Sequence, residues 1–231
     1  MILAANLKVN HTRTEIKEYT KSLETSLTSK KTKNEVLVFP NISGLDNYKV
    51  NNFTVGAQNA YPTKSGAYTG EICLEQLEHF DINTILIGHS ERRVLLKESN
   101  DFIKQKFEFY KSKGFKIVFC IGESLDIREE GISKIKDFLY SQLDGIDLGY
   151  DNLIVAYEPI WSIGSGKTAS VEQINETLDI IRTKFSSSLL YGGSVKATNI
   201  KEITDIKNCD GVLIGGASNE VKNFIEMIEL I

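Results

Sequence analysis

The chain has 231 residues, of which 41% are hydrophobic and 25% charged, as expected for a globular protein with a sizeable core. A formal net charge of −4 gives no basic surface for nucleic acid, and the apolar run at the N-terminus is too short for a signal peptide or a membrane span. The three cysteines are widely spaced and form no metal-ligand pattern with the three histidines, so we expect reduced thiols in the cytoplasm and neither disulfides nor a metal site.

Short apolar runs typical of buried strands recur along the whole chain. The expected strands are residues 2–5, 36–39, 53–56, 84–87, 116–121, 153–157, 189–191 and 211–214. Apolar residues at helical spacing are clearest at residues 15–27, 101–111, 133–143 and 171–185. No linker divides the chain, so the alternation predicts one (β/α)8 barrel domain over residues 1–231. An open doubly wound sheet is the alternative, but the GxGxxG sequence that would follow its first strand is absent.

Polar residues follow the expected strands at their C-terminal ends, where a barrel of this kind builds its active site. Asn6 and Lys8 follow the first strand, His89 and Glu91 the fourth, and Glu158 ends the sixth. Paired glycines follow the seventh and the eighth. The sequence therefore predicts one site at this end of the barrel.

Glu158 stands at the mouth of a buried strand, directly before Pro159. A poorly solvated carboxylate in that position has a raised pKa and suits a general base. The small, polar stretch that follows predicts a lid, in which the N–H of Gly164 would cap an anion. Its sequence GSGKT at 164–168 resembles the tail of a nucleotide-binding phosphate loop, but that motif requires glycine where Trp161 stands, so we set that interpretation aside.

His89 and Lys8 supply the groups that a developing oxyanion needs. Residues 90–92 after His89 are expected to form the first turn of a helix, whose N-terminal partial charge would lower the pKa of the imidazole. The neutral ring would then donate a hydrogen bond to the oxyanion. Lys8 would add a fixed positive charge for that oxyanion and for a substrate dianion.

Five segments of the chain, in order, resemble the signatures of the triosephosphate isomerase family. They are NLK at 6–8, GHSERR at 88–93, AYEPIWSIGSGKT at 156–168, YGGSV at 191–195 and GGAS at 215–218. Each lies at a strand end, and together they cover the chain nearly from end to end. The resemblance implies a TIM barrel that interconverts dihydroxyacetone phosphate and D-glyceraldehyde 3-phosphate in glycolysis and gluconeogenesis, with no metal or organic cofactor.

The resemblance also implies a role for each matching residue. Glu158 would be the general base, His89 the electrophile and Lys8 the positive charge at the oxyanion. Asn6 would hold Lys8 or the substrate, and Glu91 would orient Lys8. The substrate and its phosphate would be bound by Asn6, Lys8, Gly164, Gly193, Ser194, Gly215 and Gly216, the last four in the phosphate corner that recurs after strands seven and eight of such barrels.

The loop at residues 64–71 matches a loop that in the family projects into a twin subunit. Thr69 occupies the matching position, so the resemblance implies a homodimer. A surface loop without a partner is the alternative. We expect no nucleic acid or membrane partner, only a small triose phosphate substrate.

Two other functions remain to be weighed. Another phosphate-binding barrel enzyme, such as a lyase or synthase, would need a Schiff-base lysine within a strand, and no strand carries one that the pattern requires. A non-catalytic interaction protein on the same fold would be expected to lack part of the Lys8, His89 and Glu158 set, and this set is complete.

Overall fold

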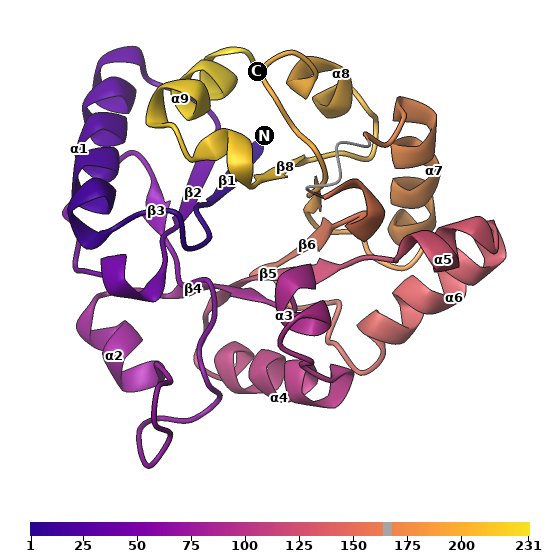
Figure 1. The fold of residues 1–231 in the computed structure, drawn as a ribbon, viewed down its shortest axis with the longest axis horizontal. Helices are drawn as coiled ribbons and strands as arrows, with labels where there is room; N and C mark the ends of the chain where they lie inside the picture. The colour runs from indigo at the N-terminus through magenta and orange to yellow at the C-terminus, as the bar shows by residue number, and fades with distance from the viewer. Residues whose placement is uncertain (164–167) are drawn as a thin grey trace.

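The computed structural model describes residues 1–163 and 168–231 of the chain. In this part of the chain eight parallel strands form one sheet in the order β3-β2-β1-β8-β7-β6-β5-β4. A parallel bridge between Ala57, just after β3, and Ile85 of β4 closes the sheet into a barrel (Figure 1). The strands are β1 (Ile2–Asn6), β2 (Glu35–Phe39), β3 (Thr54–Val55), β4 (Thr84–Ile87), β5 (Lys116–Ile121), β6 (Leu153–Tyr157), β7 (Leu189–Tyr191) and β8 (Gly211–Ile214). The expected (β/α)8 barrel is confirmed.

Both faces of the strands are buried, which explains why they appear in the sequence as continuous apolar runs. Alternate residues of each strand, such as Ala4, Val118 and Leu213, point into the barrel and pack on one another. The intervening residues, such as Leu3 and Phe119, pack outward against the helices. The barrel interior is therefore a packed core, and the site must lie at one of its ends.

Nine α-helices lie outside the barrel in the described part of the chain. They are α1 (Arg13–Lys30), α2 (Leu74–His79), α3 (Ser90–Val94), α4 (Asn100–Lys111), α5 (Leu125–Glu129), α6 (Ile132–Leu143), α7 (Val171–Arg182), α8 (Ile200–Thr204) and α9 (Val221–Glu229). Short 3-10 turns are η1 (Ile42–Gly44), η2 (Ile160–Ser162) and η3 (Gly216–Ser218). The helix α1 starts at a capping box, in which the N–H of Thr12 donates to the carboxylate of Glu15 at 2.7 Å and its hydroxyl accepts the N–H of Glu15.

The element boundaries differ from the expected ones chiefly in α1, α7 and β3, while β1, β2, α4 and α6 each extend one residue further at one end. The helix α1 runs beyond 15–27 at both ends, because the capping box extends its start and polar residues continue its last turn. The helix α7 ends at Arg182 and not at 185, since Phe185 leaves the helix to fill the core. The strand β3 is only two residues long, although the N–H of Gly56 still donates to Val38 O at 2.9 Å.

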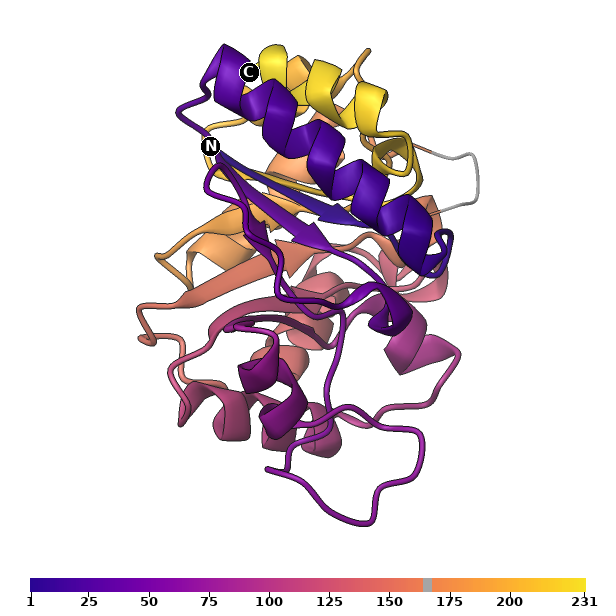
Figure 2. The same ribbon diagram turned by 90° about the vertical axis from the view of Figure 1, so that its left-hand side faces the viewer.

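The loop at residues 64–71 protrudes from the body of the molecule near α2 (Figures 1 and 2). Its residues are exposed, and the ring of Tyr68 packs on that of Tyr61 with 4.3 Å between the centroids. The cysteines Cys73, Cys120 and Cys209 are all free and buried. None of the helices in the described ranges is long and apolar enough to cross a membrane.

Candidate active site

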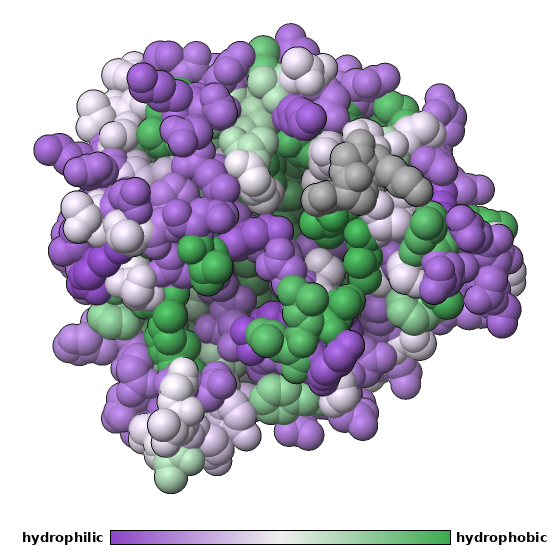
Figure 3. All heavy atoms as spheres, viewed as in Figure 1, coloured by the Kyte–Doolittle hydropathy of each residue, from purple (hydrophilic) through white to green (hydrophobic). Residues whose placement is uncertain are grey.

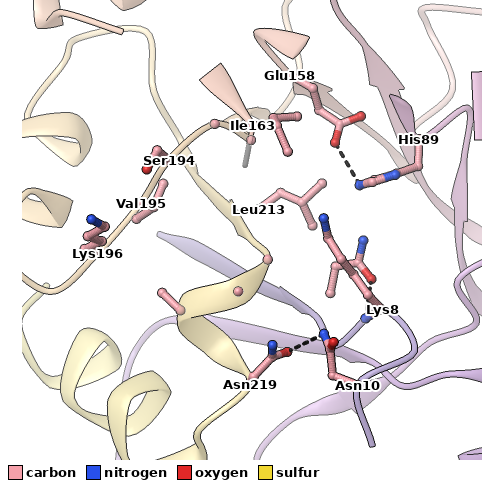
Figure 4. A pocket seen from close by; sticks show the side chains of 16 residues that line it. Lys8, Asn10, His89, Glu158, Ile163, Ser194, Val195, Lys196, Leu213 and Asn219 are labelled. Atoms are coloured by element: carbon pink, nitrogen blue, oxygen red, sulfur yellow. Dashed lines mark hydrogen bonds and ion pairs between the residues drawn. The ribbon is translucent and has the colours of Figure 1, made fainter. Parts of the chain in front are cut away.

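A cavity of about 420 Å³ opens at the C-terminal end of the barrel strands. Most of the residues expected at the site line it: Asn6, Lys8, His89, Glu158, Gly193, Ser194, Gly215 and Gly216 (Figure 4). Glu91 lies behind Lys8, and Thr69 lies outside this cavity in the protruding loop. Gly164 falls outside the described residues. The barrel thus brings together side chains from β1, β4, β6, β7 and β8 that are far apart in the sequence.

Glu158 and His89 are in direct contact on one side of the cavity (Figure 4). The Oε1 atom of Glu158 lies 2.9 Å from Nε2 of His89, and its Oε2 atom accepts the N–H of Ser90 at 2.9 Å. The two residues are 2% and 7% exposed, respectively. Glu158 is held at the end of β6 by its own N–H, which donates to Ile121 O at 2.7 Å. A buried carboxylate and an imidazole thus form a hydrogen-bonded pair facing the cavity.

Lys8 reaches the same space from the end of β1, with its backbone in the left-handed region at φ 49°. A non-glycine residue keeps this conformation only when its surroundings hold it there. The Oδ1 atom of Asn6 accepts the Lys8 N–H at 3.1 Å, and the side-chain amide of Gln58 donates to Lys8 O at 2.8 Å. The Nζ atom is 2.5 Å from Oε1 of Glu91. These contacts direct the ammonium group toward the Glu158 and His89 pair.

The other side of the cavity is built from turns that follow β7 and β8. Ser194 lies across the cavity from His89 in the close-up view (Figure 4). At Gly193 a Cβ atom would lie 2.2 Å from the hydroxyl of Tyr191, so only glycine fits at that bend. The turn η3 begins after Gly215, and the amides of its first residues have no preceding helical carbonyl to bind. Among the described residues, amide groups and a hydroxyl line this side of the cavity, and no carboxylate does, which suits a phosphate.

The sequence of the whole chain, residues 1–231, matches the family model described as triosephosphate isomerase. The chain belongs to the triosephosphate isomerase family. It is 54% identical to a triosephosphate isomerase of a Sulfurovum species over 228 residues, which is 99% of each chain. It is 50% identical to one from a Nitratiruptor species over 231 residues, covering 100% of this chain and 98% of the relative. A Helicobacter pylori triosephosphate isomerase is 55% identical over 198 residues, 85% of each.

Membership of the triosephosphate isomerase family makes the chain an isomerase and decides between the functions inferred from the sequence. Neither a lyase or synthase nor a non-catalytic protein on this fold is favoured. Among the described residues, no three histidine, cysteine or acidic side chains are placed to hold a metal ion. The described residues able to hold a substrate anion include Lys8, the Ser194 hydroxyl and the amides of the two glycine turns.

The protonation of the pair differs from that expected from the sequence. Burial raises the pKa of Glu158, but the charge and hydrogen bond of His89, the N–H of Ser90 and the charge of Lys8 together outweigh it, and the pKa lies below its ordinary value. Burial lowers the pKa of His89, and the carboxylates of Glu158 and Glu91 together outweigh it, so that this pKa is raised. The expected raised pKa of Glu158 and lowered pKa of His89 are therefore wrong for this arrangement, because each group stabilises the charged form of the other.

One contact of His89 opposes that charged form. The N–H of Glu91 donates to Nδ1 of the ring at 3.2 Å, so Nδ1 acts as an acceptor and the proton is on Nε2. In a doubly protonated ring, the N–H at Nδ1 would face the N–H of Glu91, and two donors cannot hydrogen-bond to each other. The backbone at the start of α3 thus favours the neutral ring with a donor at Nε2, whereas the carboxylates of Glu158 and Glu91 favour the charged one.

The sequence did not indicate every residue that supports this triosephosphate isomerase site. The side-chain amide of Gln58 fixes both Lys8 O and Phe39 O, each at 2.8 Å. Its place after the third expected strand was a signal, but nothing in the sequence pairs it with Lys8. Glu123, fully buried beside η2, accepts from Trp161 Nε1 and Tyr157 Oη at 2.9 Å each, and burial raises its pKa. This carboxylate anchors the turn η2 to the end of β6.

Proposed function

We propose that the chain interconverts dihydroxyacetone phosphate and D-glyceraldehyde 3-phosphate with Glu158 as the general base. The carboxylate takes a proton from the carbon beside the carbonyl, and the electron pair of that C–H bond moves into an enediolate. The proton then returns to the neighbouring carbon, which exchanges the positions of the carbonyl and the hydroxyl. The observation that carries this proposal is the buried Glu158 carboxylate beside His89 in a cavity that Lys8 also enters.

His89 and Lys8 act on the two substrate oxygens. The N–H at Nε2 of His89 donates to the oxygen on which charge develops and moves a proton between the two oxygens, while Lys8 stabilises that charge. Glu91 and Asn6 orient Lys8. A substrate that enters between Glu158 and His89 removes the contact that lowers the pKa of Glu158, leaving burial, which makes the carboxylate a stronger base. For His89, the same separation leaves burial and the N–H of Glu91 at Nδ1, both of which favour the neutral ring.

The phosphate binds opposite the reacting carbons. Its oxygens accept hydrogen bonds from the amides of Gly193, Gly215 and Gly216 and from the Ser194 hydroxyl. Gly164, in the lid expected from the sequence, would donate to the same group. Closure excludes water and protects the enediolate from losing its phosphate. The substrate is thus held at both ends while the proton moves, in the reaction that glycolysis and gluconeogenesis share.

We infer that two such chains form a homodimer through the loop at residues 64–71, with Thr69 reaching toward the lysine and histidine of the partner subunit. Apolar groups lie exposed on the same face, including a cluster over α3 (Figure 3). Val9 is 85%, Leu95 71% and Leu96 61% exposed, and burial in an interface would remove this apolar surface from water. Light scattering on the purified chain tests this, because a monomer at micromolar concentration would contradict the dimer.

We propose further that residues 1–231 act as one domain and that the protein works in the cytoplasm. One closed eight-stranded sheet supports the first statement, and three cysteines that are free and buried support the second. Limited proteolysis, which divides a chain at a domain linker, tests the first of them. Fractionation of cells that produce the protein tests the second.

The substitution Glu158→Gln tests the base directly. Turnover of glyceraldehyde 3-phosphate should fall at least ~10²-fold, the lower end for a positioned general base. The assay contains a chelator, and Glu172→Gln, at an exposed glutamate of α7, is the matched control. Unchanged turnover in Glu158→Gln would remove Glu158 from the mechanism, and a folded but inactive wild type would refute the isomerase function itself.

A further inference from the structure

Side chains from α1 and from the segment that joins β1 to α1 hydrogen-bond to the C-terminal end of the turn η3, on the side opposite the cavity. The hydroxyl of Tyr19, on α1, donates to Ser218 O at 2.8 Å, and Nε2 of His11 lies 3.0 Å from Asn219 O. Tyr19 is only 4% exposed, and its ring meets that of His11 edge-on, with 5.9 Å between the centroids. Both carbonyls lie at the C-terminal end of the turn, opposite the amides that face the cavity.

The turn has few other means of keeping its orientation. It is one 3-10 turn, closed by the Ser218 N–H to Gly215 O at 2.9 Å and by the Asn219 N–H to Gly216 O at 3.2 Å. Of its first two residues, Gly216 has no side chain and Ala217 has only a methyl group, which packs against the core, and the Ser218 hydroxyl bonds back within the turn and to the end of β8. A small rotation would redirect the amides of Gly215 and Gly216, so donors that fix the last carbonyls also fix the first amides.

The same segment joins the two ends of the site. Lys8 precedes His11 by three residues, and between them the side-chain amide of Asn10 donates to Oδ1 of Asn219 at 3.2 Å (Figure 4). The two helices that flank the contact, α1 and α9, lie side by side in both ribbon views (Figures 1 and 2). The lysine at the reacting carbons and the amides at the phosphate therefore share one support.

We propose that His11 and Tyr19 are positioning residues that hold the amides of η3 in the orientation that a phosphate group requires. This inference rests on the proposed function, in which those amides bind the substrate phosphate. Neither residue lines the cavity, so each acts through the turn and not on the reacting atoms. Removing either donor should weaken the binding of phosphate and leave the proton transfer at the other end of the site in place.

Four variants test the inference. Tyr19→Phe removes only the hydroxyl, His11→Ala removes the ring donor, and His11→Gln keeps an N–H donor of similar reach. The control is Tyr150→Phe, because the hydroxyl of Tyr150 also donates to a backbone carbonyl, that of Phe115, at 2.7 Å before β5 and away from the site. Calorimetric titration measures the Kd of inorganic phosphate, and kinetics measure KM and kcat with glyceraldehyde 3-phosphate and with phosphate-free D-glyceraldehyde.

Tyr19→Phe and His11→Ala should each raise the Kd of phosphate and the KM for the phosphorylated substrate between about 2- and 10-fold, as expected for one lost hydrogen bond. Reaction with D-glyceraldehyde should be unchanged, and His11→Gln and Tyr150→Phe should bind phosphate like the wild type. An unchanged Kd in Tyr19→Phe and His11→Ala, or an equal loss on both substrates, would overturn the inference while the isomerase function stands. A wild type that lacks isomerase activity but binds phosphate, with weaker binding in the two variants, would refute the proposed function and support the positioning.

Discussion

Replacing Gly122 with alanine should displace the proposed catalytic base without touching its side chain. Gly122 directly follows β5, and its backbone is not in the left-handed region. A Cβ atom there would lie 1.8 Å from the carbonyl oxygen of Glu158 and 2.8 Å from its carbonyl carbon. Both are backbone atoms, so no side-chain rotation can relieve the overlap, and one of the two segments must move.

Neither segment is free to move without loss. The side chain of Gln142 accepts the N–H of Gly122 at 2.8 Å and donates to its carbonyl at 3.0 Å, and this amide is 7% exposed. On the other side, the N–H of Glu158 is bonded to Ile121 O at 2.7 Å. Restoring ordinary contact requires a separation greater by roughly 1.5 Å. A misplacement of ~1 Å in a catalytic group can cost ~10²-fold in rate, and such overpacking typically costs ~1–3 kcal/mol of stability.

Gly122→Ala should therefore fold, with a lower Tm, and lose about 10²-fold in kcat. The measurements are steady-state isomerisation of glyceraldehyde 3-phosphate and thermal unfolding followed by circular dichroism. Gly149→Ala is the matched control, because a Cβ atom there meets only an oxygen of Asp147 at 3.5 Å, far from the site. A folded Gly122→Ala variant with the kcat of the wild type would refute the idea that the backbone of Glu158 must stay in this position.

Two further outcomes are expected from the contacts around Glu158 and Lys8. The pKa of Glu158 is lowered from 4.5, so the stability that it contributes is fully present above pH 4.5 and is lost as the pH falls through its pKa in the folded state. The pKa of His89 is raised from 6.5, so the stability that it contributes is fully present below pH 6.5 and is lost as the pH rises through its pKa in the folded state. The difference in Tm between wild type and Glu158→Gln should thus be largest between pH 4.5 and 6.5, and a difference that does not vary from pH 4 to 9 would contradict the pairing. Gln58→Ala should lower kcat/KM about 10-fold by releasing the carbonyl of Lys8, a loss of about 1.4 kcal/mol. Unchanged kcat/KM in a folded Gln58→Ala variant would show that Lys8 keeps its left-handed backbone without this contact.

The strands were predictable because a strand that is buried on both faces has apolar residues at successive positions, which form one continuous apolar run in the sequence. The strands β4 through β8 have the expected boundaries, and each ends where glycine or a charged residue interrupts the run. The strand β3 was overestimated, since Phe53 and Gly56 continue the apolar pattern without continuing the strand. The end of α7 was placed too late because Phe185 has the spacing of a helical core residue but packs from the connection that follows.

The site was predictable as a set of residues, and the resemblance also predicted the contact of Lys8 with Glu91, but its other contacts were not predictable. The rule that catalytic groups follow barrel strands selects Lys8, His89 and Glu158 one at a time. It says nothing of the 2.9 Å contact between Glu158 and His89, which reverses the pKa directions expected for each residue alone. Gln58 satisfies this rule by its place after β3, but its contacts, like those of the donors behind η3, could not be predicted, because each is made with a backbone carbonyl of a distant segment, which any residue type can supply.

The charges of Lys8 and Glu158 are paired before substrate arrives, and this pairing explains how one site can bind an anion beside a carboxylate. Lys8 is bound to Glu91, and Glu158 is hydrogen-bonded to His89 and the N–H of Ser90. The phosphate subsite adds amides and a hydroxyl, so a dianion meets dipoles there and is kept at a distance from the Glu158 carboxylate. Substrate binding must then separate Glu158 from His89, and the free energy for that separation comes from the phosphate contacts at the other end.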